Sequence, residues 1–282
     1  MLEKHSFGNA FAKLLTLNLV LTVTAVLLVL PFTWMILTSL KLIEEIGADS
    51  WLPEVCQWHN YKDVFSTKGI FFGRWYWNTI FVSCWITFLQ VFTSSLAAFS
   101  FSRLQWKGRD QVFFLYLATM MLPGLVMMVP NYQNMVLLEL VDSYTGLILP
   151  AAFSAFGTFM MRQFMMNIPS SLDEAAEIDG ANKLQQFLRI TFPLLRGTHF
   201  TVFILGMLGS LKCYDIVYVL TDGGPNFATE MFSTYIQRLS FNLFKQGEAS
   251  TVVVIMFVIA MVITAAQLML YYRGNKDKEL AR

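Results

Sequence analysis

ASTVVVIMFVIAMVITAAQLMLYY, residues 249–272, is a run of 24 residues without an Asp, Glu, Lys or Arg. A helix rises about 1.5 Å per residue, so a helix that crosses a bilayer needs roughly 20 mostly apolar residues. This run is long enough to do so. Four further runs lack charged residues in the same way, and each also predicts a transmembrane helix: 14–40, 75–102, 111–138 and 143–161.

A sixth apolar stretch, at about 198–221, contains Lys212 and Asp215 but is otherwise rich in apolar and aromatic residues. We expect it to span the membrane too, which gives an all-α membrane protein with six transmembrane helices. The composition agrees, because 56% hydrophobic and 14% charged residues leave too little polar surface for a water-soluble globule. A net charge of +1 argues against a nucleic-acid partner. The partner of the apolar surface is the lipid bilayer.

The distribution of Lys and Arg orients the helices, because these residues favour the cytoplasmic side. With the N-terminus inside, the internal segments hold 13 basic residues and the external ones hold 6. Both termini are therefore expected in the cytoplasm. The external connection 38–74 has aromatic residues in it or at its ends, and we expect them at the membrane interface: Trp51, Trp58, Tyr61, Trp75 and Trp77.

The internal loop 162–196 predicts a helix-turn-helix, which we call the elbow. Ser171 followed by Glu174 fits a capping box, so a helix is expected to start there. Gly180 stands where that helix would end in a left-handed C-cap. A second helix is expected from about 182 to 189, with Pro193 as its stop.

Small residues on the elbow, Ala175 and Ala176, would let a groove of another protein approach the backbone closely. This favours a docking element. The alternative from the residues alone is an amphipathic hairpin that rests on the membrane surface.

The elbow resembles the EAA signature of bacterial ATP-binding-cassette importer permeases. Glu174-Ala175-Ala176 is followed after three residues by Gly180, and Ile190 and Pro193 come later at the spacing of the signature. Phe192 stands where a leucine is usual. The fuller string resembles the carbohydrate branch, of the maltose and glycerol-phosphate type: Ile168-Pro169, Glu174-Ala175-Ala176, Asp179-Gly180-Ala181, Phe187, Ile190 and Pro193.

This resemblance implies the fold of a type I importer permease, whose elbow couples to a separate ATPase. The implied coupling residues are Glu174, Ala175, Ala176, Asp179, Gly180, Ala181, Ile190 and Pro193. The implied partners are a second permease, expected to be a different chain, two copies of the ATPase and an extracytoplasmic sugar-binding protein. The implied location is the bacterial cytoplasmic (inner) membrane. The permease core is expected at 73–272, after a first segment 1–72 and before a tail 273–282.

The chain itself offers no nucleotide site. No glycine in it is followed by lysine, so the phosphate loop G-x-x-x-x-G-K-[ST] cannot form. ATP and magnesium are thus expected on the partner ATPase, with no cofactor and no metal in this chain. The three cysteines lie far apart, which argues against a disulfide framework and a zinc site. His5, His59 and His199 are scattered, which argues against a membrane-embedded enzyme.

Four polar residues in the fifth stretch are candidates for the substrate path. Lys212 and Asp215 are three apart and would share a helix face, where they could pair. Tyr214 and Tyr218 are four apart on a neighbouring stripe. One interpretation is a surface that contacts sugar; the other is an internal ion pair beside interfacial tyrosines.

Glycine and proline mark further features. Gly223-Gly224-Pro225 predicts a tight external turn, which either contacts a binding protein, forms a gate or simply connects two helices. Prolines predict interruptions in the third and fourth helices, at Pro123, Pro130 and Pro150. Gly206 and Gly209 are expected to permit close helix packing.

The sequence therefore predicts the permease subunit of a sugar importer. The alternative within transport is an ATP-binding-cassette permease for another polar solute, such as a polyol, glycerol phosphate or a polyamine. An ion-coupled carrier that acts alone is disfavoured by the elbow.

Overall fold

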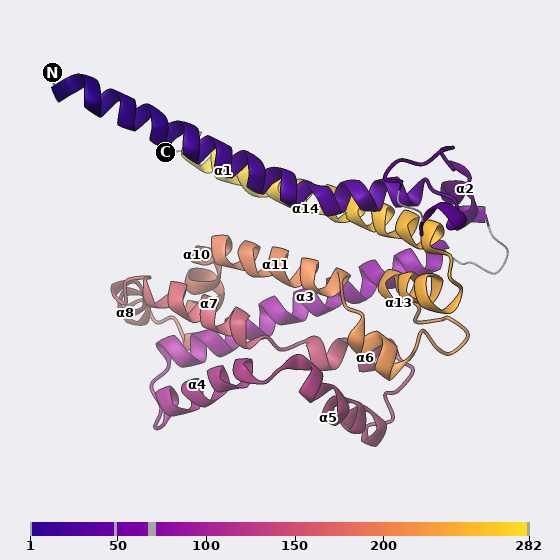
Figure 1. The fold of residues 1–282 in the computed structure, drawn as a ribbon. Coiled ribbons are helices and arrows are strands. Elements are labelled where there is room, and N and C mark those ends of the chain that lie inside the picture. Colours follow the sequence, from indigo (N-terminus) through magenta and orange to yellow (C-terminus); the bar gives the residue numbers. More distant parts are fainter. Residues whose placement is uncertain (1, 48–49, 67–71, 281–282) are drawn as a thin grey trace. The chain divides into compact units, whose positions relative to one another are not determined.

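The computed structural model describes residues 2–47, 50–66 and 72–280, and these residues form helices without any strand (Figure 1). Contacts divide the chain into two units. The first comprises Met1–Ile70 and Ile236–Phe257, and the second comprises Phe71–Tyr235 and Val258–Arg282. The prediction of an all-α protein is confirmed.

The first unit is built around one end of the long helix α1 (Leu2–Ser39). Asn60 of α2 (His59–Ser66) and Thr251 of α14 (Gln246–Leu280) both donate hydrogen bonds to the Ser39 carbonyl, at 2.9 and 3.3 Å. In its most apolar stretch, by contrast, α1 buries none of its residues. That surface is left for lipid or for a partner subunit.

The aromatic residues of the external connection divide into two groups. Trp51 packs edge-on against Trp34 with ring centroids 5.0 Å apart, and both Trp51 and Trp58 keep more than half of their surface exposed. This exposure fits the interfacial location predicted for them. Trp75 differs: it is buried in the second unit and donates to the Phe227 carbonyl at 3.3 Å. The Trp75 ring therefore packs against protein and not against lipid, and its depth in the membrane stays a prediction.

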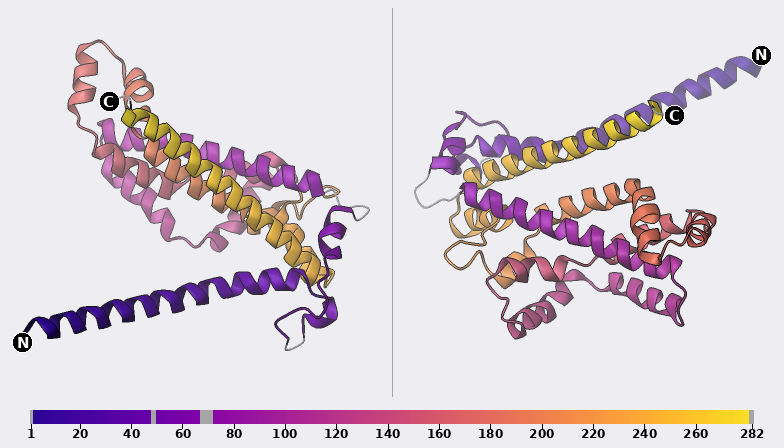
Figure 2. Two further views of the ribbon diagram at one scale, coloured as in Figure 1. Left: turned by 90° about the horizontal axis from the view of Figure 1, so that it is seen from above. Right: turned by 180° about the vertical axis from the view of Figure 1, so that it is seen from behind.

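Helix α3 (Phe72–Arg103) is the centre of the second unit, and α7 (Ala155–Met166) and α11 (Arg196–Leu211) pack along it (Figures 1 and 2). Small residues bring the helices close together. A Cβ added to Gly157 of α7 would lie 2.7 Å from the Oγ of Ser94. Buried hydroxyls on α3 donate to carbonyls of their own helix, as Thr87 does to Ser83 at 2.7 Å.

The third apolar run, 111–138, is not one helix. It consists of α4 (Arg109–Ala118), a short 3-10 turn (Thr119–Met121) and α5 (Gly124–Leu137), with a bend of 104° at the break. Pro123 occupies the break in an extended conformation at the N-cap position of α5. The interruption expected at this proline is confirmed, whereas Pro130 stands inside α5.

The fourth run is also broken, into α6 (Tyr144–Ala151) and α7, at an angle of 44°. Pro150 lies in the last turn of α6. The Oγ of Ser154 then accepts from the Gly157 amide at 3.0 Å and caps α7. The chain thus ends one helix and starts another inside the predicted span.

The fifth stretch breaks at the polar residues themselves. Helix α11 ends at Leu211, and α12 (Asp215–Leu220) begins after a three-residue interruption. The carbonyl of Cys213, freed by this interruption, accepts a hydrogen bond from Ser233. The expectation that Lys212 and Asp215 share the face of one continuous helix is therefore wrong.

Among the residues that the structure describes, three helices are long and apolar enough to cross a membrane: Leu15–Ser39, Phe72–Arg103 and Gln246–Arg273. Three bent helix pairs bring the number to six if each pair is one span, which agrees with the predicted six. The third pair differs in its bounds from the predicted fifth span. It joins Lys183–Leu194 to α11 at 74°.

Candidate functional site

The elbow lies at the end of the second unit where α3 ends (Figures 1 and 2). Its first helix is α8 (Ser171–Ile178). The predicted capping box of Ser171 and Glu174 is wrong, because Ser170 is the N-cap and no side chain caps this helix. A capping side chain needs an extended backbone, whereas Ser170 is already helical at φ −63° and ψ −25°. Glu174 is consequently an exposed side chain of the first turn.

The end of α8 matches the prediction. Gly180 has a φ of +81°, and the amides of Gly180 and Ala181 donate to the carbonyls of Glu177 and Ala176 at 3.0 and 2.8 Å. This pair of bonds is the Schellman motif, which requires a left-handed residue at the position of Gly180. An added Cβ at Gly180 would meet no atom within 4 Å. The backbone angle, not a lack of space, selects glycine there.

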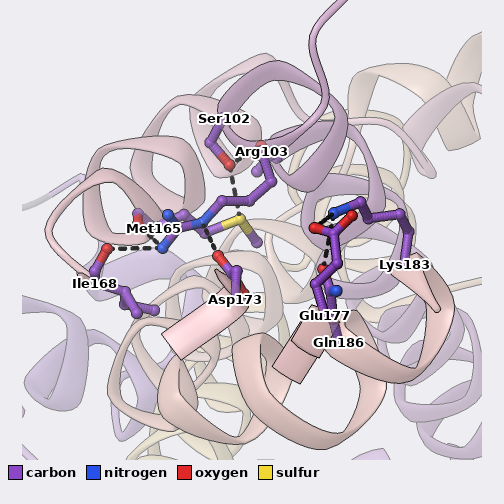
Figure 3. A network of polar contacts seen from close by, with 9 residues as sticks. Ser102, Arg103, Met165, Ile168, Asp173, Glu177, Lys183 and Gln186 are labelled. Atoms are coloured by element: carbon purple, nitrogen blue, oxygen red, sulfur yellow. Dashed lines mark hydrogen bonds and ion pairs between the residues drawn. The ribbon is translucent and has the colours of Figure 1, made fainter. Parts of the chain in front are cut away.

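The second helix of the elbow starts with a capping box that the sequence analysis missed. The Oδ1 of Asn182 accepts from the Gln185 amide, and the Oε1 of Gln185 accepts from the Asn182 amide, both at 2.8 Å. The signal was an Asn followed three residues later by a Gln. Lys183 then bridges the two helices, because its Nζ lies 2.9 Å from the Oε2 of Glu177 (Figure 3).

Pro193 does not stop this second helix, contrary to the expectation. Helix α9 (Lys183–Gln186) continues as a π-helix (Phe187–Thr191) and then as α10 (Phe192–Leu194). The amide of Phe192 donates to the Phe187 carbonyl five residues back. This wider turn carries the helix up to a proline that has no amide proton to donate, and the chain bends only after Leu194.

Arg103, the last residue of α3, fixes the elbow to the helix bundle (Figure 3). Its guanidinium donates to the carbonyls of Met165 and Ile168 at 2.9 and 2.8 Å. Its Nε lies 3.2 Å from the Oδ2 of Asp173, and the two side chains are only 13% and 15% exposed. The contact lacks the alignment of a hydrogen bond, so Asp173 is held by charge. The sequence analysis did not predict this pair.

The outer surface of the elbow carries most of the predicted coupling residues. Glu174, Ala175, Asp179, Gly180 and Pro193 are exposed, and Ala181 and Ile190 are half-buried. Ala176 is buried within the elbow, so of the two alanines only Ala175 offers its side to another protein. Between them stand exposed apolar side chains that a partner could cover: Leu172, Ile178, Leu184 and Leu188.

The four substrate-path candidates are only partly brought together. The rings of Tyr214 and Tyr218 stack with centroids 5.3 Å apart. Lys212 and Asp215 are both exposed, and no ion pair joins them in the described part of the chain. Asp215 instead lines a hollow of about 90 Å³ between α12 and α5, together with Asn131.

The turn at Gly223, Gly224 and Pro225 is clamped to the other end of α3. Gly223 has a φ of +79°, as expected for a tight turn. The amide of Asn78 near the start of α3 donates to the carbonyls of Ala228 and Glu230, at 2.7 and 3.0 Å. The turn and the elbow thus lie at opposite ends of one helix.

Comparison with known proteins gives a consistent result. Residues 90–273 match the family described as "Binding-protein-dependent transport system inner membrane component". The chain is 33% identical over 200 residues to an arabinooligosaccharides transport system permease protein of Bacillus subtilis, which covers 70% of this chain and 71% of that one. It is 37% identical over 172 residues to a polygalacturonan/rhamnogalacturonan transport system permease protein of the same organism, covering 60% and 59%.

A solved structure shares the fold. It belongs to a bacterial ABC transporter involved in the import of the acidic polysaccharide alginate. The match covers 92% of this chain and 95% of that chain, with a TM-score of 0.75 and 23% sequence identity. The broken spans and the elbow are therefore arranged on the fold of an importer permease.

Proposed function

Because the chain belongs to the family of inner-membrane components of binding-protein-dependent transport systems, we propose that it forms half of the translocation path of an ATP-driven sugar importer. It is a transport permease and not an enzyme. The support for sugar is the substrate class in the names of its relatives, which are transporters of arabino-oligosaccharides and of galacturonan polymers.

The proposed assembly contains this chain, a second and different permease, two ATPase subunits that hold ATP and magnesium, and an extracytoplasmic sugar-binding protein. We place it in the bacterial cytoplasmic membrane with both termini of this chain inside. The core 73–272 carries the path, with the elbow of loop 162–196 facing the ATPase. The turn at Gly223-Gly224-Pro225 faces the binding protein.

The observation that carries the proposed coupling is the attachment of the elbow to α3. The Schellman turn at Gly180, the capping box at Asn182 and the Lys183–Glu177 bridge hold the two short helices at one angle. Arg103 ties that rigid piece to the end of α3. When an ATPase dimer closes and displaces the elbow, α3 moves with it.

The test is reconstitution of the whole complex. This chain is expressed with the ATPase, the second permease and the binding protein of its complex, and the complex is placed in vesicles with ATP inside or outside. We expect saccharide uptake that requires ATP on the elbow side and requires the binding protein. Uptake by this chain without any ATPase would show an ion-coupled carrier instead. ATP-dependent uptake of glycerol phosphate or a polyamine, and of no saccharide, would favour the alternative solutes.

A further inference from the structure

A cavity of about 280 Å³, partly open to the surface, lies between α3, the α6–α7 break and α11 of the second unit. Ile86 and Gln90 of α3 line it, together with Ser154 from the break, Gly209 in the last turn of α11 and Cys213 just beyond α11. Its volume is close to the lower limit of about 300 Å³ that is common for small-molecule sites. None of these residues is among the four that the sequence predicted for the substrate path.

The cavity is at the depth where a transporter holds its solute. Ile86 and Gln90 stand at the middle of α3, which runs from Phe72 to Arg103. Two interrupted spans meet there, one broken before Ser154 and one after Leu211. In transporters, discontinuous helices surround the substrate near the midplane of the bilayer, because irregular backbone is tolerated only next to protein or water.

The backbone carbonyls at the break between α6 and α7 are hydrogen-bonded to α3 and do not depend on water or solute in the cavity. Gln90 donates to the Ala151 carbonyl at 2.8 Å, and Thr93 donates to the Ala152 carbonyl at 2.9 Å. Ser94 donates to the Ser154 carbonyl at 3.3 Å. The carbonyls of the break are thus satisfied by α3. The side-chain NH2 of Gln90 is used in this way, and its side-chain oxygen can accept a hydrogen bond from a hydroxyl group of a solute.

The chemistry of the lining names the class of solute. The lining combines amide, hydroxyl and thiol groups with apolar surface and the ring of Phe156, and it contains no Asp, Glu, Lys, Arg or His. A charged solute would lose part of its hydration there without gaining a counter-charge, which is unfavourable. We propose that this cavity is the part of the path that holds the solute, and that it takes a neutral polyhydroxylated ring. The proposal rests on the proposed transport function.

Gly209 gives a steric test. An added Cβ at this position meets no atom within 4 Å, so Gly209→Leu projects into open space and is also favourable for the helix. Gly73→Leu is the matched control, because Gly73 has the same open surroundings in α3 and does not line the cavity. In the reconstituted complex we expect Gly209→Leu to lower saccharide uptake at least about tenfold, with normal membrane levels, while Gly73→Leu transports at the parental rate. Parental uptake by Gly209→Leu overturns the proposal.

Cys213 gives a binding test that does not depend on transport. In the complex with Cys56→Ser and Cys84→Ser, Cys213 is the only cysteine of this chain, and its alkylation by a small neutral maleimide is timed. We expect arabinotriose or maltotriose to slow the reaction at least about fivefold near saturation, and glycerol 3-phosphate and spermidine to leave it unchanged. A chain that retains only Cys84 should show no protection. Equal protection by a charged solute, or none by any saccharide, contradicts the inference.

A result that refutes the proposed function can be distinguished from a result that refutes only the cavity proposal. A parental complex without ATP-dependent uptake of any saccharide would refute sugar import, and the cavity would still be judged by the solute that protects Cys213.

Discussion

Arg103 shows how one side chain can join two parts of a transporter. It donates to one carbonyl in the last turn of α7 and to one just after α7, and it faces the carboxylate of Asp173 in the elbow. Both charged groups are mostly buried. Loss of one of them therefore leaves the other charge without its partner and with little water to solvate it. Such a loss costs roughly 3–5 kcal/mol for fully buried pairs, and the residual exposure lowers the figure here. The Lys183–Glu177 bridge is more than half exposed and contributes far less.

These contacts predict an order of effects. Arg103→Ala removes the counter-charge of Asp173 and two hydrogen bonds to carbonyls, so it should be the most damaging change. Asp173→Asn should cost less, because Arg103 keeps both carbonyls. The control Glu177→Gln should be close to neutral. Thermal unfolding of the purified complexes and the ratio of ATP hydrolysed to solute imported measure these effects. Equal stability and coupling of Arg103→Ala and the parental protein would show that the pair does not hold the elbow.

Gly180 and Gly108 allow backbone strain in the elbow to be separated from strain elsewhere. Both have left-handed angles, φ +81° and +85°, and both have space for a side chain. Valine should therefore cost roughly 1–2 kcal/mol at either position. Gly180→Val should insert normally but lose its ATPase or its solute-stimulated hydrolysis, whereas Gly108→Val should keep both. Copurification and ATPase assays decide, and Gly180→Asn should recover function, because asparagine tolerates this conformation. If Gly180→Val couples ATP hydrolysis to transport as the parental protein does, the angle between the elbow helices is not required for coupling.

At the scale of elements, the sequence predicts features that depend on neighbouring residues. It does not predict features that depend on contacts between distant segments. The charge-free runs predicted the apolar spans, and the spacing of the glycine predicted the Schellman turn. The breaks inside the spans leave hydropathy unchanged, so only the prolines signalled them. What makes the α6–α7 break stable is the polar face of α3, which is some 60 residues away in the sequence. No pattern within either segment shows that pairing.

The glycines of α11 make the same point. Gly206 packs as predicted, because its added Cβ would lie 2.9 Å from the Oε1 of Gln90. Gly209 has open space beside it and lines a cavity, although the sequence gives both residues the same expected role. The Ser171 capping box failed for a related reason. The motif was present, but the backbone before it was already helical.

The break between α11 and α12 changes the expected behaviour of Lys212 and Asp215. On one helix they would couple, and neutralising both would cost less than neutralising one. Lys212 lies in the interruption, and the described part of the chain has no ion pair between Lys212 and Asp215, so the effects of Lys212→Met and Asp215→Asn on stability should add to within about 0.5 kcal/mol. A double-mutant cycle on the unfolding of the purified protein measures this. Recovery in the double variant would show that the two charges pair after all.

Across the second unit, α3 links the two faces of the membrane. It has 32 residues and is therefore about 48 Å long, enough to cross the hydrocarbon core with turns to spare. Asn78 near its start holds the turn at Gly223-Gly224-Pro225, Gln90 at its middle lines the cavity, and Arg103 at its end holds the elbow. A displacement of the elbow is thus transmitted by one rigid helix to the cavity and to the turn at Gly223-Gly224-Pro225.

This arrangement requires the elbow and the start of α3 to face opposite sides of the membrane, with the elbow inside. The excess of basic residues in the internal segments predicts that orientation, and single cysteines in an otherwise cysteine-free chain test it. Lys107→Cys and Gln185→Cys should resist a membrane-impermeant maleimide added to sealed cells, and Val55→Cys, Leu138→Cys and Leu243→Cys should react. All five positions are exposed in the chain, so burial does not explain a lack of reaction. Permeabilised cells should label all five. If Gln185→Cys reacts from outside in sealed cells, the elbow cannot meet a cytoplasmic ATPase, and the coupling through Arg103 has no source of motion.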